Sequence, residues 1–122
     1  MKTVLIADDE PSLRLLVAAT ISSDQYTVLE APDGDTAWRM LQEHRPALAL
    51  LDVQMPGRSG LQLTRAIKSD PHLADIQVIL LSSKTQAADI EAGLAAGADL
   101  YLTKPFSPLV LLTTVERALE LV

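Results

Sequence analysis

Three acidic residues, a serine and a lysine stand where short apolar runs of this sequence end. They are Asp8, Asp9, Asp52, Ser82 and Lys104, and they follow the runs 3–7, 47–51, 76–81 and 100–103. If these runs are parallel strands, their carboxyl ends meet at one edge of the sheet, where chemistry collects in such folds. Carboxylates there would repel one another, by about 4 kcal/mol at 4 Å with an effective dielectric constant near 20. A divalent cation and the Lys104 ammonium are the natural groups to neutralise them.

These residue types indicate chemistry on phosphorus. All-oxygen donors favour a hard cation, and a few carboxylates that leave room for water and phosphate oxygens suit Mg²⁺. A carboxylate beside Mg²⁺ and a lysine can attack phosphorus and form an aspartyl phosphate. The cation and the lysine offset charge on the transferring group, while the Ser82 hydroxyl can bond a phosphoryl oxygen. The cluster therefore predicts phosphoryl capture on Asp52.

Buried strands must position this cluster, and the run 47–51 is the clearest of them. It shows no polar alternation and is bounded by Arg45-Pro46 and Pro56-Gly57, which favours a strand covered on both faces, although a buried helix segment shares its periodicity. The predicted strands are 3–7, 26–30, 47–51, 76–81 and 100–103. The first predicted helix starts within residues 8–12 and has its apolar positions between Leu13 and Ile21. The other predicted helices are 35–44, a helix from Gly60 to Asp70, 85–96 and 108–121. Strict alternation predicts an α/β fold, a five-stranded parallel sheet with helices on both faces.

Helical periodicity also predicts which side chains face the core and which face partners. In the first helix, Leu13, Leu16, Val17 and Ile21 form the predicted inward stripe. The run Leu109 to Thr114 is too apolar for every side chain to face the core, so one or two are candidates for a partner surface. Gly97 is a suitable left-handed end for the helix before it.

Composition excludes several classes of protein. The 122 residues carry 10 basic and 16 acidic side chains, a net charge of −6, and no cysteine. An acidic chain lacks the clustered Lys and Arg that nucleic acids and anionic membranes require. Without cysteine there is no disulfide, thiolate catalysis or cysteine zinc site. No run approaches the ~20 apolar residues of a membrane span. We therefore expect a single cytoplasmic domain over residues 1–122, with no direct nucleic acid binding and no membrane insertion.

Motifs along nearly the whole chain resemble the receiver domain of two-component response regulators. The residues that carry the resemblance are Asp8-Asp9, the stretch Leu51-Asp52-Val53-Gln54-Met55-Pro56-Gly57, Leu81-Ser82-Ser83, Gly97-Ala98-Asp99 and Lys104-Pro105-Phe106. The resemblance implies a flavodoxin-like, doubly wound (βα)5 fold with strand order 2-1-3-4-5. It also implies that Asp52 is the phosphoacceptor.

The resemblance further assigns roles to individual residues. Mg²⁺ would be held by Asp8, Asp9, Asp52 and the backbone carbonyl of Gln54. The phosphoryl group would be contacted by Ser82, Ser83 and Lys104, with a cis peptide between Lys104 and Pro105. Ser82 and Tyr101 would form the conformational switch, and Gln54 and Lys84 would tune the lifetime of the phosphoryl group. Ser83 or Thr85 could instead cap the following helix.

The implied partner is a sensor histidine kinase or a histidine phosphotransfer protein, and the signal would pass to an unknown output domain or downstream protein. Arg14 and Leu15 are candidates for contact with the kinase. In this interpretation the domain is a switch and not an enzyme, since it catalyses only its own phosphoryl uptake and slow dephosphorylation. A dimer through charged pairs is doubtful, because Leu100 stands where regulators often have an acid.

Two other functions remain open. One is a receiver-like interaction module that works without phosphorylation. The other is an aspartyl-nucleophile phosphatase of the haloacid dehalogenase type, whose pattern places a second Asp two residues after the nucleophile. Gln54 occupies that place, so hydrolysis should be slow.

Overall fold

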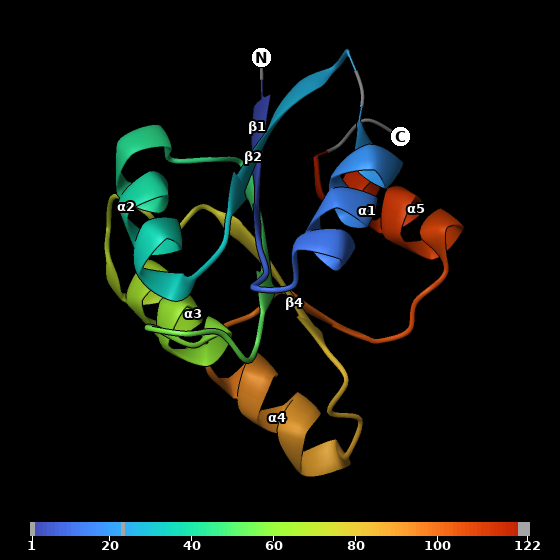
Figure 1. Cartoon of the computed structure of the whole chain (residues 1–122). Helices are drawn as coiled ribbons and strands as arrows, with labels where there is room; N and C mark the ends of the chain where they lie inside the picture. The colour runs from blue at the N-terminus through green and yellow to red at the C-terminus, as the bar shows by residue number, and fades with distance from the viewer. Residues whose placement is uncertain (1, 23, 120–122) are drawn as a thin grey trace.

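The computed structural model describes residues 2–22 and 24–119. Five strands and five helices alternate along the chain (Figure 1). The strands are β1 (Lys2–Ala7), β2 (Tyr26–Ala31), β3 (Leu48–Asp52), β4 (Gln77–Ser82) and β5 (Leu100–Thr103). The helices are α1 (Pro11–Ile21), α2 (Gly34–His44), α3 (Gly60–Ser69), α4 (Ala87–Ala95) and α5 (Pro108–Ala118). The alternation confirms the predicted α/β class.

The strands form one parallel sheet in the order β2-β1-β3-β4-β5, which confirms the order implied by the resemblance. β3 is buried along its whole length, as its continuous apolar sequence predicts. The registers bring Ala7 beside Leu51, and Asp52 beside Leu81. The carboxyl ends of β1, β3 and β4 therefore lie next to one another.

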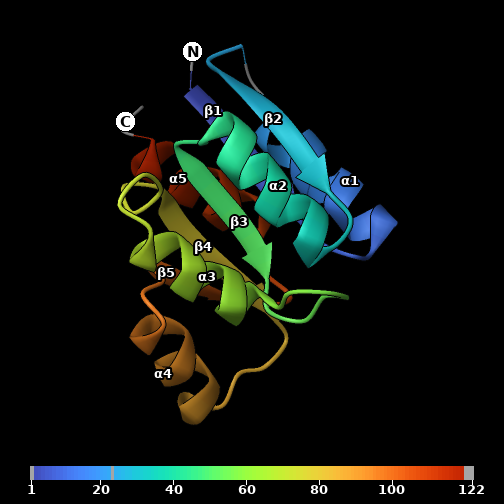
Figure 2. The same cartoon turned by 90° about the vertical axis from the view of Figure 1, so that its left-hand side faces the viewer.

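The helices cover both faces of the sheet (Figures 1 and 2). On one face α1 and α5 bury the alternate side chains of the strands, including Ile6 and Leu50, with Val17 and Val115. On the other face α2 and α3 cover the remaining ones. These are Leu5, Ala49, Leu51 and Leu80 together with the helix residues Ala37, Leu41, Leu63 and Ile67. Alternation of the side chains thus divides the core into two layers.

Local signals fix several helix ends. Asp33 begins α2 by accepting the Thr36 N–H at 2.7 Å, and Ser59 begins α3 in a capping box with Gln62. Gly97 has φ +111°, the left-handed conformation expected after α4. Neither Ser83 nor Thr85 caps α4, because Gln86 holds the capping position and makes no side-chain bond there. Helix α4 therefore begins two residues later than predicted.

The inward stripe predicted for α1 is wrong at Leu16, which is 58% exposed. Val17 and Ile21, one turn apart, are the buried residues of the helix. Leu16 lies one residue, or about 100°, away from that stripe. Since α1 also carries Leu15 on its surface, its apolar positions nearly encircle the helix, and only the sheet decides which of them is buried.

Two other elements have exposed apolar surface. Leu109 and Val110 at the start of α5 are 72% and 48% exposed, so part of this run lies on the surface as expected. Helix α5 ends at Ala118, three residues before the predicted Leu121, and residues 120–122 lie outside the described chain. In α4 the one buried residue is Gly93, so this helix inserts no large side chain into the core. No helix in the described residues is long and apolar enough to cross a membrane.

Candidate metal and phosphoryl site

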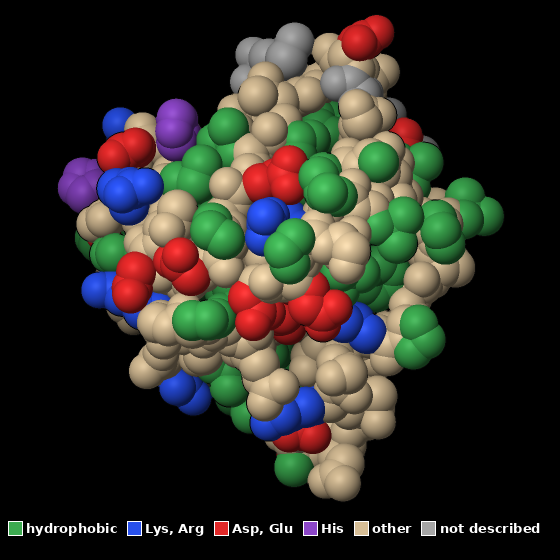
Figure 3. All heavy atoms as spheres, in the orientation of Figure 1, with side chains coloured by type: hydrophobic (Ala, Val, Ile, Leu, Met, Phe, Trp, Pro, Cys, Tyr) green, Lys and Arg blue, Asp and Glu red, His purple; other side chains and the backbone are tan. Residues whose placement is uncertain are grey.

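An acidic cluster forms where β1 and β3 end. Asp8 follows β1 and is 1% exposed, Asp52 is the last residue of β3 and is 7% exposed, and Asp9 is exposed. One carboxylate oxygen from each of the three lies within 4.8 Å of the others. Figure 3 shows acidic side chains gathered on this face where the strands end, with a basic side chain beside them. The sequence prediction that the strand ends converge is therefore met by the geometry.

Lys104 neutralises part of this charge. Its ammonium lies 3.2 Å from Asp8 Oδ2 and 3.5 Å from Asp52 Oδ1. It follows β5, and its backbone N–H donates to the Ser82 carbonyl at 2.7 Å, which joins the loop to the end of β4. The Lys104–Pro105 peptide is cis. One ammonium faces three carboxylates, so the cluster keeps a net negative charge that suits a cation.

Burial raises the pKa of the Asp52 carboxyl to about 6, and the charge of Asp8 acts in the same direction. Lys104 and a backbone hydrogen bond from Gln54 oppose this shift. Asp52 is still mainly ionised at pH 7, but ionising this buried carboxyl costs free energy in the folded state. Such a perturbed carboxyl in a hollow is typical of a functional site.

A polar cavity of about 270 Å³ opens above the cluster. It is lined by Asp9, Glu10, Asp52, Gln54, Ser82, Ser83 and Lys104. Its walls carry carboxylates and hydroxyls and no histidine or cysteine, a donor set that fits Mg²⁺ with room for water and a phosphoryl group. The residues that could hold the ion are Asp8, Asp9 and Asp52, and Gln54 lines the same space.

A series of hydrogen bonds runs from Ser82, the last residue of β4, through Lys84 to Tyr101 in β5. Ser82 is 2% exposed, and its Oγ accepts the Lys84 N–H at 3.0 Å. The Lys84 carbonyl accepts the Tyr101 hydroxyl, also at 3.0 Å. The Tyr101 ring packs under α4, where a Cβ on Gly93 would lie 2.8 Å from it. Lys84 is exposed and does not line the cavity, unlike Ser82 and Ser83.

The loop after β3 is held against the start of α2. The Gly34 N–H donates to the Pro56 carbonyl at 3.0 Å, and a Cβ on Gly34 would lie 1.8 Å from the Arg58 carbonyl. Arg58 stacks 4.8 Å from the Trp38 ring centre and pairs with Asp35 at 3.9 Å. Backbone-to-backbone packing of this kind needs a glycine, and it fixes the loop that carries Gln54.

Arg14 is a site neighbour that the sequence interpretation missed. It is also a candidate for contact with the kinase, which the structure does not test, and its side chain is 17% exposed and reaches back to the acidic loop. Nη1 donates to the Asp8 carbonyl at 2.7 Å, and Nε donates to Glu30 at 3.2 Å. These contacts join α1, the β1–α1 loop and β2, which no local pattern reveals.

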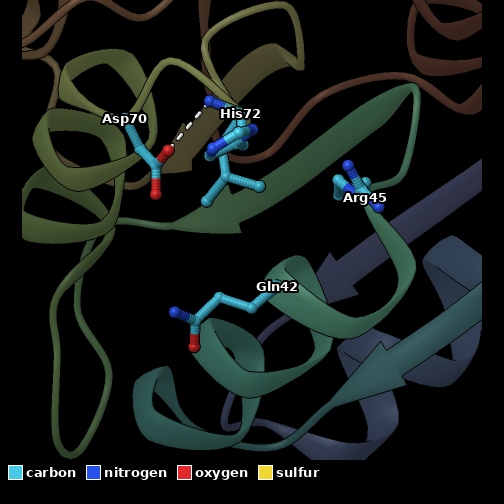
Figure 4. A pocket seen from close by; sticks show the side chains of 5 residues that line it. Gln42, Arg45, Asp70 and His72 are labelled. Atoms are coloured by element: carbon cyan, nitrogen blue, oxygen red, sulfur yellow. Dashed lines mark hydrogen bonds between the residues drawn. The ribbon is translucent and has the colours of Figure 1, made fainter.

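Among the hollows outside the acidic cavity, two lie beside residues of interest. An apolar groove of about 380 Å³ adjoins it and is lined by Leu13, Leu16, Ser83, Lys104, Pro105 and Phe106. The second hollow lies at the far edge of the sheet, where α2 and α3 end (Figure 4). There the His72 N–H donates to Asp70 at 2.8 Å, beside Arg45 and Gln42. Among the described residues, neither histidine belongs to the metal-binding cluster.

Comparison with known proteins identifies the family. The family model for the response regulator receiver domain matches residues 4–116. The phosphate regulon transcriptional regulatory protein PhoB of Pseudomonas aeruginosa is 39% identical over 119 residues, which cover 98% of this chain and 52% of PhoB. The chain spans about half the length of the curated relatives it matches.

Solved structures agree. The chemotaxis response regulator CheY4 of Vibrio cholerae is 32% identical with a TM-score of 0.88, over 97% of this chain and 98% of CheY4. The receiver domain of a signal transduction histidine kinase from Syntrophus aciditrophicus is 34% identical with a TM-score of 0.90, over 100% of this chain and 92% of that one. These matches confirm the resemblance inferred from the motifs. The chain belongs to the response regulator receiver domain family of two-component signalling proteins.

Proposed function

We propose that Asp52 accepts a phosphoryl group from a phosphohistidine and that this reaction switches a partner-binding face. The observation that carries the proposal is the position of Asp52. It is a nearly buried carboxylate at the end of the central strand, 3.5 Å from the Lys104 ammonium and within 4.8 Å of two further carboxylates, at the base of a polar cavity.

The reaction is an in-line substitution at phosphorus. An Asp52 carboxylate oxygen forms a bond to phosphorus while the phosphorus–nitrogen bond of the donor breaks. The leaving imidazole nitrogen takes the bonding electrons and is protonated by water. Lys104 offsets negative charge on the transferring oxygens, and Ser82 and Ser83 are hydroxyl donors to them. Mg²⁺, held by Asp8, Asp9, Asp52 and the Gln54 carbonyl, would supply further positive charge. Asp8 and Asp9 would hold the ion, so in this proposal neither would act as a free general base.

The output of the switch rests on the series of hydrogen bonds from Ser82 to Tyr101. A phosphoryl group adds about −1.5 to −2 charges and strong acceptor oxygens. The Ser82 Oγ would turn from the Lys84 N–H toward that group, and Tyr101 would adjust because its hydroxyl is bonded to the Lys84 carbonyl. We propose that Gln54 and Lys84 set the lifetime of the phosphoryl group from the rim of the site. Substituting either should change the dephosphorylation rate without unfolding the protein.

The donor would be a sensor histidine kinase or a histidine phosphotransfer protein. The apolar groove shares Ser83 and Lys104 with the acidic cavity, so we propose that the histidine-bearing partner covers it. Leu16→Asp should then slow transfer from a phosphorylated histidine phosphotransfer domain and leave the reaction with acetyl phosphate unchanged. Equal slowing with both donors would contradict this docking surface.

Further parts of the proposal follow from the family. Response regulators are signalling switches, and we propose that this chain is likewise no turnover enzyme. We treat residues 1–122 as a single receiver that acts in the cytoplasm on an output domain or downstream protein. PhoB of Pseudomonas aeruginosa, which is about twice as long as this chain, is a transcriptional regulatory protein, and transcriptional regulation is one example of such an output.

The test is phosphorylation by a small donor. Wild type, Asp52→Asn and the exposed control Asp75→Asn are incubated with Mg²⁺ and acetyl phosphate, and intact masses are read at early times. We expect one added phosphoryl group on wild type and on the control but none on Asp52→Asn. Modification of Asp52→Asn would contradict the assignment of the acceptor. No modification of wild type, with Mg²⁺ shown to bind, would favour an interaction module that works without phosphorylation.

A further inference from the structure

Arg14 makes two hydrogen bonds that converge on the acidic loop. Its Nη1 donates to the Asp8 carbonyl at 2.7 Å, and its Nε donates to Glu30 Oε1 at 3.2 Å. The Arg14 side chain is 17% exposed, whereas the Glu30 side chain is 36% exposed. The Arg14 guanidinium therefore connects Glu30 of β2 to the backbone of Asp8, whose carboxylate belongs to the proposed metal site.

The bond to Asp8 is one of several that fix this residue. The Asp8 N–H donates to the Ala31 carbonyl at 3.1 Å, and Asp8 Oδ1 accepts the Glu10 N–H at 2.9 Å. The Arg14 N–H in turn donates to the Glu10 carbonyl at 2.9 Å. Arg14 thus holds both ends of residues 8–10, the short loop that joins β1 to α1 (Figure 1). Among these contacts, the hydrogen bond from Arg14 Nη1 is the one that connects a side chain of α1 to the Asp8 carbonyl, which belongs to the peptide between Asp8 and Asp9.

We propose that Arg14 is a positioning residue for the Mg²⁺ site and that Glu30 orients it. Arg14 fixes the peptide that joins Asp8 to Asp9, and the relative position of their carboxylates follows from that peptide. This inference rests on the proposed function, because it concerns the ion that Asp8, Asp9 and Asp52 would bind. Groups just outside the ligands of a metal commonly act in this way, and their loss costs tenfold or more in affinity.

A role through charge alone predicts the opposite sign. The guanidinium is a positive charge near a site for a cation, so it repels Mg²⁺. If Arg14 acted only by its charge, a neutral side chain would strengthen Mg²⁺ binding and a lysine would leave it unchanged. If Arg14 acts by position, both changes weaken binding, because neither side chain has the planar fork that reaches two acceptors in fixed directions.

The experiment measures Mg²⁺ dissociation constants by titration calorimetry on metal-stripped protein, together with urea unfolding of each variant. The variants are Arg14→Lys, Arg14→Gln, Glu30→Gln and the double variant Arg14→Lys/Glu30→Gln. Arg39→Lys and Glu43→Gln are matched controls, since this exposed pair on α2 lies 4.0 Å apart and neither residue lines the acidic cavity or belongs to the carboxylate cluster.

We expect Arg14→Lys and Arg14→Gln each to weaken Mg²⁺ binding about tenfold, while the controls stay within twofold of wild type. Glu30→Gln should weaken it less, and the double variant should bind no more weakly than Arg14→Lys, because Glu30 acts through Arg14. Unchanged affinity in Arg14→Lys, with or without lower stability, or tighter binding in Arg14→Gln, would overturn the inference alone. Absence of Mg²⁺ binding by wild type would overturn the proposed function and this inference together.

Discussion

Replacing Asp52 by Asn is expected to stabilise the metal-free protein at neutral pH, although it removes the proposed acceptor. The pKa of Asp52 is about 6 in the folded state, against an ordinary value of 3.8. Well below the ordinary pKa of 3.8 the carboxyl is protonated in both folded and unfolded chains, so it carries no penalty. Between pH 3.8 and about 6 the unfolded chain releases the proton while the folded chain still holds it, so the free energy of unfolding falls as the pH rises. Above about pH 6 both states are ionised and the loss of stability is complete.

The size of the effect follows from the shift. One pKa unit corresponds to 1.36 kcal/mol, so a shift of about two units gives about 3 kcal/mol at pH 8 as an upper value. The attraction of Lys104 is already included in that pKa. Asn keeps a buried polar group that must also leave water, which reduces the expected gain to about 1–3 kcal/mol.

Urea unfolding in EDTA at intervals from pH 4 to pH 8 measures this difference. The free energy of unfolding of Asp52→Asn relative to wild type should increase between pH 4 and pH 7 and then level off. Asp75→Asn, a change at an exposed acid, should run parallel to wild type. Adding Mg²⁺ should stabilise wild type more than Asp52→Asn, because the ion binds only the folded state. A pH-independent difference, or a variant less stable than wild type at pH 8, would refute the reasoning.

Two further substitutions test the surroundings of the site. Lys104→Met removes the ammonium that pairs with buried Asp8, so we expect the metal-free protein to lose about 3–5 kcal/mol of stability and to regain part of it when Mg²⁺ binds. Urea unfolding with and without Mg²⁺ measures both effects. A loss of stability that is the same with and without the ion would contradict this expectation. Gly34→Ala adds a Cβ that would lie 1.8 Å from the Arg58 carbonyl, and the resulting backbone shift should cost about 1–3 kcal/mol. A melting temperature equal to that of wild type would show that the loop after β3 yields freely.

The sequence was enough to predict that Asp8, Asp52, Ser82 and Lys104 meet. Each ends a short apolar run, and parallel strands bring their carboxyl ends to one edge whatever the details of packing. The same argument located the strands to within one or two residues. It could not supply the pKa of Asp52, because that value depends on burial and on the exact approach of Asp8 and Lys104.

The positions of Leu16 and Arg14 could not be predicted for a related reason. A helix that is apolar nearly all round has no single stripe, so the sheet and α5 decide that Val17 is buried and Leu16 is not. Arg14 finds its partners in β2 and in the preceding loop, and sequence distance gives no sign of either contact. Helical periodicity describes one element, whereas both outcomes depend on how several elements pack.

Helix α4 has a consequence for how the folded chain opens. Because its one buried residue is Gly93, lifting the helix from the sheet would expose little apolar surface. Elements with few buried apolar contacts exchange their amide hydrogens through small openings at low free energy, while the rest of the molecule stays closed. The amides of α4 should therefore exchange well before those of β3, whose residues are all buried. The region next to Tyr101 would then be a separately unfolding unit within an otherwise cooperative domain.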